Sequence, residues 1–196
     1  WYRFVTDGLV ESVAVVTSGG DDAVYLVVNR NTIRCIEEMK PMFSDYYVDS
    51  GIQITKAGAS ASGLSHLEGK TVAIVTEDEA SEAVVESGSV PLPESIPLGA
   101  EVTIGLPYTG VMTSMRYTPP ARIKRISEVT LRVLDSYPFG VGPDEDTLET
   151  ARFTGPFSGE IPVPIRGDWT REAFVTVVQR SPRPVTILCL VAEVES

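Results

Sequence analysis

The chain has 196 residues, of which 43% are hydrophobic and 22% are charged, and its net charge is −11 with an isoelectric point near 4.5. This is the composition of a globular protein with one large or two small domains. The acidic balance argues against a nucleic-acid groove and against an anionic membrane surface, because both contacts need clustered Lys and Arg. It leaves open a conduit through which nucleic acid slides without binding.

Neither terminus carries a segment that suggests membrane insertion. No apolar run approaches the roughly 18 residues of a membrane span, and we expect no signal peptide. The chain starts at Trp1 within a run that resembles the inside of a strand. We therefore expect the sequence to be part of a longer protein.

Residues 11–38 contain three runs with strand character, separated by short turns. Gly19 and Gly20 can supply the positive φ of a hairpin turn, and 29–31 forms the next turn. Residues 32–38 alternate apolar and polar side chains, as a half-buried strand does. The pattern predicts a three-stranded meander of the kind found in propellers and sandwiches.

Between Gly63 and Tyr108, short β-branched runs alternate with Gly, Pro, Asp and Ser, and no helical period interrupts them. The expected strands are 52–55, 70–76 and 102–104. Residues 58–63 are expected to form a loop, and the acidic run 77–79 a solvated turn. The sequence predicts a compact antiparallel module here, a small barrel or a sandwich.

After a boundary at 118–121, residues 126–134 alternate strictly, so that Val129, Leu131 and Val133 share one face of a long strand. A helix is the alternative for this segment. Residues 137–157 are rich in Gly, Pro and acid and predict an irregular excursion with a short helical turn at 146–151. The last expected strands are 161–165, 174–178 and 185–191.

Together these elements predict an all-β fold in which an outer antiparallel sheet, propeller- or sandwich-like, receives an inserted small β-barrel module. The outer domain comprises 1–47 and 117–196, and the module comprises 48–116. We prefer this to a linear series of domains because each outer segment is too small to bury a core alone.

Few residues point to chemistry. His66 is the single histidine, which leaves too few ligands for a structural zinc site, and we expect a turn histidine that hydrogen-bonds to the backbone. Cys35 and Cys189 are far apart in apolar runs, which favours two buried free thiols over a bridge. No Gly-x-Ser-x-Gly elbow is present. We therefore expect no enzyme, no cofactor and no metal site.

The glycine-rich and acidic stretches also favour structural roles. Residues 69–71 resemble the end of a phosphate-binding loop, but they open a strand where such a loop opens a helix. The acidic clusters 77–79 and 144–146 lack the spacing of a calcium loop. We expect solvated turns, with an incidental cation site as the alternative.

One basic cluster stands out, with Arg122, Lys124 and Arg125 at its centre. It predicts a contact with an acidic neighbour, either another subunit or a phosphate backbone. The alternative is a solvated strand end that pairs with the protein's own excess acid. Trp1, Trp169 and two adjacent tyrosines are candidate interface anchors, although packing within the fold explains them equally well.

Several phrases together resemble the tail nozzle or phage stabilisation class of tailed-bacteriophage structural proteins. The phrases, in chain order, are Glu11-Ser-Val-Ala-Val-Val, Asp22-Ala-Val-Tyr-Leu-Val-Val-Asn-Arg, Ile33-Arg-Cys-Ile-Glu-Glu-Met, Tyr47-Val-Asp-Ser-Gly, Gly63-Leu-Ser-His-Leu-Glu-Gly-Lys-Thr-Val-Ala, Ile104-Gly-Leu-Pro-Tyr and Lys124-Arg-Ile-Ser-Glu-Val-Thr-Leu-Arg-Val. In that class they occur near the carboxyl end of a large protein rich in propeller-like sheets. They are sheet and turn motifs and carry no catalytic residues.

The central segment also resembles the small β-barrel inserted in the first catalytic half of ubiquitin-activating enzymes. That likeness implies a shared barrel and nothing more, because the nucleotide site and catalytic cysteine of those enzymes have no counterpart here.

The tail resemblance implies a virion structural protein, a nozzle or tail-hub component made in the bacterial host cytoplasm. Its partners would be other copies in a ring, with six-fold symmetry expected, and other tail proteins, while DNA passes through without specific binding. An alternative is a receptor- or glycan-binding tail tip, suggested by Tyr46, Tyr47, Tyr108 and Tyr117. A cell-wall hydrolase is a third and weaker possibility.

Overall fold

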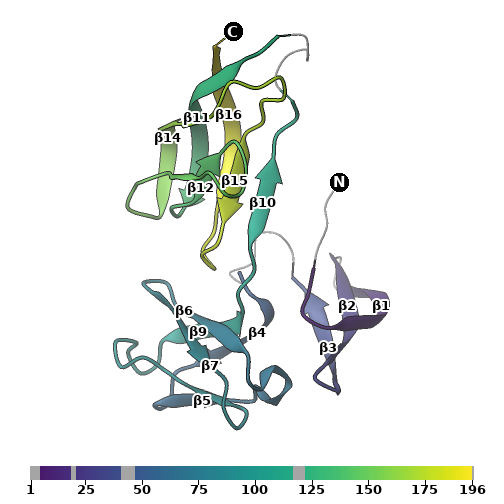
Figure 1. The fold of residues 1–196 in the computed structure, drawn as a ribbon. Coiled ribbons are helices and arrows are strands. Elements are labelled where there is room, and N and C mark those ends of the chain that lie inside the picture. The colour runs from purple at the N-terminus through teal and green to yellow at the C-terminus, as the bar shows by residue number, and fades with distance from the viewer. Residues whose placement is uncertain (1–4, 19–20, 41–46, 117–121, 196) are drawn as a thin grey trace. The chain divides into compact units, whose positions relative to one another are not determined.

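The computed structural model describes residues 5–18, 21–40, 47–116 and 122–195. Over these residues the fold is all-β, with five antiparallel sheets and one short 3₁₀ helix (Figure 1). No helix in this part of the chain has the length and apolar character needed to cross a membrane. The chain divides into two compact units, Trp1–Pro107 and Tyr108–Ser196.

The first unit begins with a three-stranded sheet, here called the open sheet, in the order β1-β2-β3. Its strands are β1 (Leu9–Ser18), β2 (Asp21–Arg30) and β3 (Ile33–Met39). The two residues between β2 and β3, Asn31 and Thr32, have φ of 46° and 71°, which is the geometry of a type I′ hairpin turn. The predicted meander is confirmed, while its first turn at Gly19 and Gly20 lies outside the described residues.

The middle of the chain forms a module of two sheets around one core. A four-stranded sheet has the order β4-β9-β6-β7, and a two-stranded ribbon pairs β5 with β8. The elements are β4 (Asp49–Thr55), β5 (Ser60–Ser62), η1 (Ser65–Leu67), β6 (Thr71–Val75), β7 (Ala80–Val84), β8 (Ser89–Pro91) and β9 (Glu101–Leu106). Their buried side chains, among them Leu64, Val72, Val102 and Ile104, form a single hydrophobic cluster.

Two expectations for this module are wrong. No sheet closes into a barrel within the described residues, because β4 and β7 end the four-stranded sheet as unpaired edges. The expected loop at 58–63 contains β5, since Ala61 pairs with Val90 and both are buried in the core. The expected strands and the acidic turn at 77–79 are confirmed.

The second unit packs a three-stranded sheet, β14-β11-β16, with a four-stranded sheet, β10-β15-β12-β13. The strands are β10 (Gly110–Thr113), β11 (Arg125–Ser136), β12 (Gly140–Gly142), β13 (Glu149–Thr150), β14 (Phe157–Pro164), β15 (Thr176–Gln179) and β16 (Thr186–Glu195). Val129, Leu131 and Val133 of β11 are buried. The strand prediction and its inward face are therefore confirmed.

The helical turn expected at 146–151 is wrong. The carboxylate of Asp144 accepts hydrogen bonds from the backbone N–H groups of Asp146 and Thr147 at 3.0 and 2.6 Å. This local turn leads directly into β13, so no helix starts here. The rest of the excursion is irregular as predicted, apart from the short antiparallel pair β12–β13 within it and the start of β14 at its end.

One strand within the range of the predicted module pairs with a strand outside that range. β10 falls within the range 48–116 of the predicted module, but it pairs with β15 of the second unit. The grouping of 1–47 with 117–196 as one outer domain stays a prediction.

Candidate interaction surfaces

The most concentrated polar contact in the first unit surrounds the buried side chain of Arg30, which is 3% exposed at the end of β2. Its Nε donates to Oε1 of Glu37 on β3 at 2.7 Å, and its Nη2 contacts Oδ1 of Asp49 on β4 at 3.1 Å. It also donates to the hydroxyl of Thr6 and the carbonyl of Asp7. One guanidinium therefore joins the open sheet to the module.

The electrostatics of this cluster favour full ionisation. Burial by itself lowers the pKa of Arg30, but the hydrogen bond and charge of Glu37 and the charge of Asp49 outweigh it and raise the pKa above its ordinary value. Burial likewise raises the pKa of Glu37, and the guanidinium of Arg30 outweighs it and lowers that pKa. A hydrogen bond from Ser50 Oγ to Glu37 adds to this effect at 3.0 Å. The arrangement is a structural ion cluster whose carboxylates are held by a permanent cation.

Two further contacts join the same two parts. Lys70 Nζ lies 2.9 Å from Oδ2 of Asp7, and Asn31 Nδ2 donates to the carbonyl of Glu68 at 3.4 Å. Lys70 is the lysine of the loop-like Gly-Lys-Thr sequence. Here it makes an ion pair and Thr71 opens β6, as the sequence predicts.

His66 lies half-buried in η1 and hydrogen-bonds to the backbone of Ser50. Burial lowers its pKa, and the charge of Glu37 opposes that effect. The expected turn histidine with a backbone partner is confirmed.

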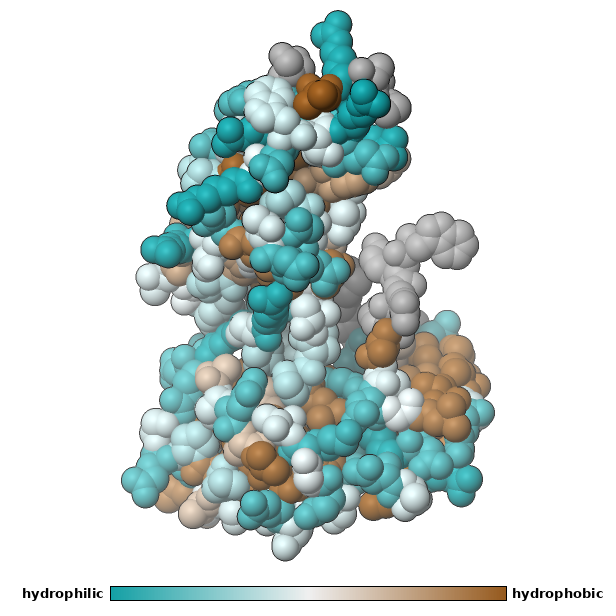
Figure 2. All heavy atoms as spheres, viewed as in Figure 1, coloured by the Kyte–Doolittle hydropathy of each residue, from teal (hydrophilic) through white to brown (hydrophobic). Residues whose placement is uncertain are grey.

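The open sheet exposes an unusual amount of apolar surface. Val13 and Val15 of β1 are 60% and 62% exposed. Cross-strand neighbours share a face of a sheet, so the register groups one apolar face. Its apolar members are Val10, Val13, Val15, Val24, Leu26, Val28, Ile33, Cys35 and Met39, and the ion pair of Arg30 and Glu37 lies on the same face. Neither buried core cluster includes a residue of β1, β2 or β3, and Figure 2 shows hydrophobic surface gathered over these strands.

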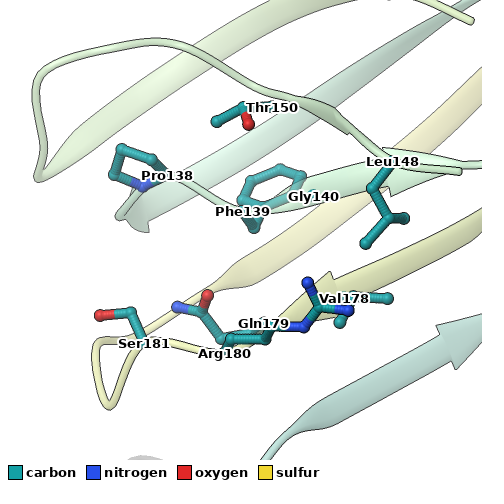
Figure 3. A pocket seen from close by; sticks show the side chains of 9 residues that line it. All are labelled: Pro138, Phe139, Gly140, Leu148, Thr150, Val178, Gln179, Arg180 and Ser181. Atoms are coloured by element: carbon teal, nitrogen blue, oxygen red, sulfur yellow. The ribbon is translucent and has the colours of Figure 1, made fainter. Parts of the chain in front are cut away.

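The second unit contains an open groove of about 290 Å³ beside β12 and β15 (Figure 3). Apolar side chains of Pro138, Phe139 and Leu148 line one part of it, and Gln179 and Arg180 line another. Both polar side chains already have internal partners, because Gln179 donates to the carbonyl of Arg183 at 2.7 Å and Arg180 donates to that of Glu145 at 3.3 Å. Among the residues that line the groove, Arg180 carries the one positive charge. No pair of ionisable side chains there is placed to transfer a proton.

The structure does not bring the predicted basic residues into one exposed patch. Arg122 is exposed, Lys124 is only 1% exposed, and Arg125 is half-buried. The backbone of Lys124 forms a two-hydrogen-bond bridge with Thr170, which draws the start of β11 inward. The subunit contact assigned to these three residues stays a prediction.

The remaining candidates occupy varied environments. Cys35 and Cys189 are both free, as expected, but Cys35 is half-buried and Cys189 is exposed, so the expectation of two buried thiols is wrong. Trp169 is exposed, Tyr47 is half-buried, and burial raises the pKa of the half-exposed Tyr108. Trp1, Tyr46 and Tyr117 lie outside the described residues. Over the described ranges, no group of three or more His, Cys, Asp or Glu side chains is placed to hold a metal ion.

No protein-family model and no curated protein matches the chain.

Sequence reasoning missed the two features that the fold assembles from distant segments. The sequence predicts Arg30 in the turn 29–31, yet it lies at the end of β2 and shares a face with Glu37 across the β2–β3 hairpin. A charged residue on the otherwise apolar face of a predicted meander is the signal that could have revealed it. The groove has no such signal, because its walls come from three separate segments.

Proposed function

We propose that the chain is a structural component of a bacteriophage tail, acting in the nozzle or tail hub within the virion. Copies assemble with one another in a ring, for which we expect six-fold symmetry, and with other tail proteins to form the conduit for DNA delivery. The chain would be made in the cytoplasm of the bacterial host. The proposal gives the protein no catalytic role.

The observation that carries this proposal is the exposed apolar face of the open sheet. Exposed hydrophobic patches of this kind mark protein–protein contacts. A sheet of three strands also needs a covering layer to be stable. We propose that a neighbouring copy supplies that layer, which would give the open sheet the role of one layer in a sandwich or one blade of a propeller.

The negative net charge of the chain supports the proposal of a conduit for DNA. A net charge of −11 gives an assembled ring an acidic character that repels the DNA backbone. Passage without adhesion requires this sign of potential, whereas a DNA-binding ring would require clustered cations.

The experiment that tests this proposal compares two variants of the full chain by native mass spectrometry and negative-stain imaging. The first replaces Val13 and Val15 with Asp on the apolar face. The control replaces Ile36, which is exposed on the opposite face of the same sheet. We expect rings for the unmodified chain and for I36D, and their loss in the double variant. A monomer at the highest attainable concentration, together with absence of the protein from purified particles, would exclude the function.

A second candidate is a receptor- or glycan-binding module at the tail tip, and the groove of the second unit favours it. An open site with apolar walls and a few polar groups suits a small polar ligand. The full chain would be applied to a glycan array, with Arg180→Ala as the matched variant. Binding that R180A abolishes would support this function, and no binding on the array would remove it.

A further inference from the structure

The two edges of the sheet β14-β11-β16 have different capacities to accept another strand. β11 lies in the centre, and among the described residues no strand pairs with the outer side of β14 or of β16. An open edge presents unpaired N–H and C=O groups to any extended chain. Whether an edge can accept another strand depends on which of its residues direct backbone N–H and C=O groups outward.

The edge formed by β14 is blocked by proline. Pro162 and Pro164 pair with Thr130 and Glu128 of β11. Proline has no N–H group, so these positions are the non-hydrogen-bonded pairs of the ladder and both proline nitrogens face outward. Ile165 N donates a hydrogen bond to the carbonyl of Ser127 at 2.9 Å, which agrees with this alternation of hydrogen-bonded and non-hydrogen-bonded pairs. An approaching strand would find two donors missing.

The edge formed by β16 is intact. The backbone N–H and C=O groups of Glu128 and Thr130 point away from β14 and toward β16. There these two residues pair with Glu193 and Val191. The backbone groups of the alternating residues Leu190, Ala192 and Val194 therefore point outward. β16 contains no proline. A register irregularity at Leu188, between the pairs of Cys189 and Ile187, limits the regular edge to 189–195.

The side chains of this edge indicate what covers it. Leu190, Ala192 and Val194 are partly buried at the rim of the core cluster, so an added strand would complete their burial. On the other face, Cys189 and Val191 are exposed, and the exposed carboxylates Glu193 and Glu195 follow them along the strand. A strand that pairs with this edge must direct apolar side chains toward the core. It must also place its own carboxylates away from Glu193 and Glu195.

A second copy of β16 meets both conditions in one antiparallel register. Centred on Ala192, the pairing sets Leu190 against Val194 of the second copy, Val191 against Glu193, and Cys189 against Glu195. No carboxylate faces another. A shift by two residues in one direction places Glu193 opposite Glu193 of the second copy, and a shift in the other direction meets the irregularity at Leu188.

We propose that two copies of the chain associate through β16 about a two-fold axis, forming one six-stranded sheet. Because β14 is blocked, the sheet cannot grow further, and association through this edge stops at two copies. This contact is separate from the apolar face of the open sheet on which the proposed function rests. Variants of β16 and variants of Val13 and Val15 therefore test the two ideas independently.

A cysteine cross-link tests the register directly. E195C would place a thiol opposite the native Cys189 of the second copy, in a non-hydrogen-bonded pair with Cα atoms about 4.5 Å apart, which a disulfide can span. Cys35 would be replaced by Ser to leave one native thiol. We expect a covalent dimer on a non-reducing gel, with the peptides containing residues 189 and 195 linked in the mass spectrum. V191C is the control, and a dimer from V191C in place of E195C would overturn the proposal.

A pair of proline variants tests the edge itself. Ala192→Pro removes only an outward N–H, as Pro162 and Pro164 do on the opposite edge, so the monomer should keep its circular dichroism and melting temperature. Two intermolecular hydrogen bonds disappear per dimer, so the dissociation constant measured by sedimentation should rise on the order of 100-fold. Val191→Pro removes an N–H that faces β11, and we expect it to destabilise the monomer. An unmodified chain that sediments only as a monomer, or a folded A192P with unchanged association, would refute the dimer.

Discussion

Arg30 and Glu37 meet inside the first unit through a hydrogen bond of 2.7 Å between Nε and Oε1, and only about one fiftieth of the arginine side chain is exposed. The contact crosses the β2–β3 hairpin, and Asp49 of β4 completes it. A buried cation of this kind adds little stability relative to apolar residues, but its removal leaves two carboxylates without a compensating positive charge.

We therefore expect Arg30→Ala to lower the free energy of unfolding of the first unit by about 3 kcal/mol. Arg34→Ala is the matched control, since Arg34 pairs with Glu11 at 2.7 Å but its side chain is largely exposed, and such pairs contribute about 0 to 1 kcal/mol. Urea unfolding followed by circular dichroism measures both. Equal losses in the two variants would contradict the structural role of the cluster.

The pH dependence of stability should include a step from His66. Its folded pKa is lowered below 6.5 by burial, so the unfolded chain binds the proton more readily. The stability contributed by the neutral form is complete above about pH 6.5 and decreases as the pH falls toward the folded pKa. Melting temperatures between about pH 7.5 and pH 5 should fall less in His66→Gln than in the unmodified chain. The lowered pKa of Glu37 produces a separate loss below its ordinary value of 4.5, which H66Q should retain.

Gly142 of β12 should tolerate no side chain. A Cβ atom there would overlap the carbonyl oxygen of Thr147, so the backbone of the neighbouring turn would have to move. We expect Gly142→Ala to destabilise the second unit by about 2 kcal/mol. Gly167→Ala is the control, because its nearest neighbours would lie 3.8 Å from the new Cβ. The fluorescence of Trp169 during denaturation would report on this unit, and a harmless G142A would show that the turn is wrongly placed.

Replacement by threonine should affect stability differently at the buried and at the exposed valines of the open sheet. Val28 is fully buried, whereas Val13 and Val15 are largely exposed. Val28→Thr should lower the free energy of unfolding by about 1 to 3 kcal/mol, because a polar group is buried. In the single chain, at concentrations where no ring forms, the double replacement of Val13 and Val15 with Thr should change it by less than about 0.5 kcal/mol. Hydrogen exchange of the β1–β3 amides measures both, and a large loss in the double variant would mean that these valines already have a covering layer.

The chain's local patterns predict its fold class and its long strands, although they miss short strands such as β5 and β13. Strict alternation in β11 predicts the buried face of Val129, Leu131 and Val133, because neighbouring side chains of a strand point to opposite faces whatever the strand packs against. Turn residues such as Asn31 predict the hairpin for the same local reason. The composition shows that His66 is the single histidine, and its position just before a strand predicts a turn histidine with a backbone partner.

Only the tertiary structure determined how the strands pair and what the pairing brings together. The open edges of the module replaced the expected barrel, since closure depends on which edge strands meet and no local pattern specifies that. The burial of Arg30 and Lys124 was also decided by the tertiary structure, because burial of a charged residue depends on partners from distant segments. The contrast between the blocked edge of β14 and the intact edge of β16 needed the register of both ladders, since a proline's effect depends on the side to which its nitrogen points.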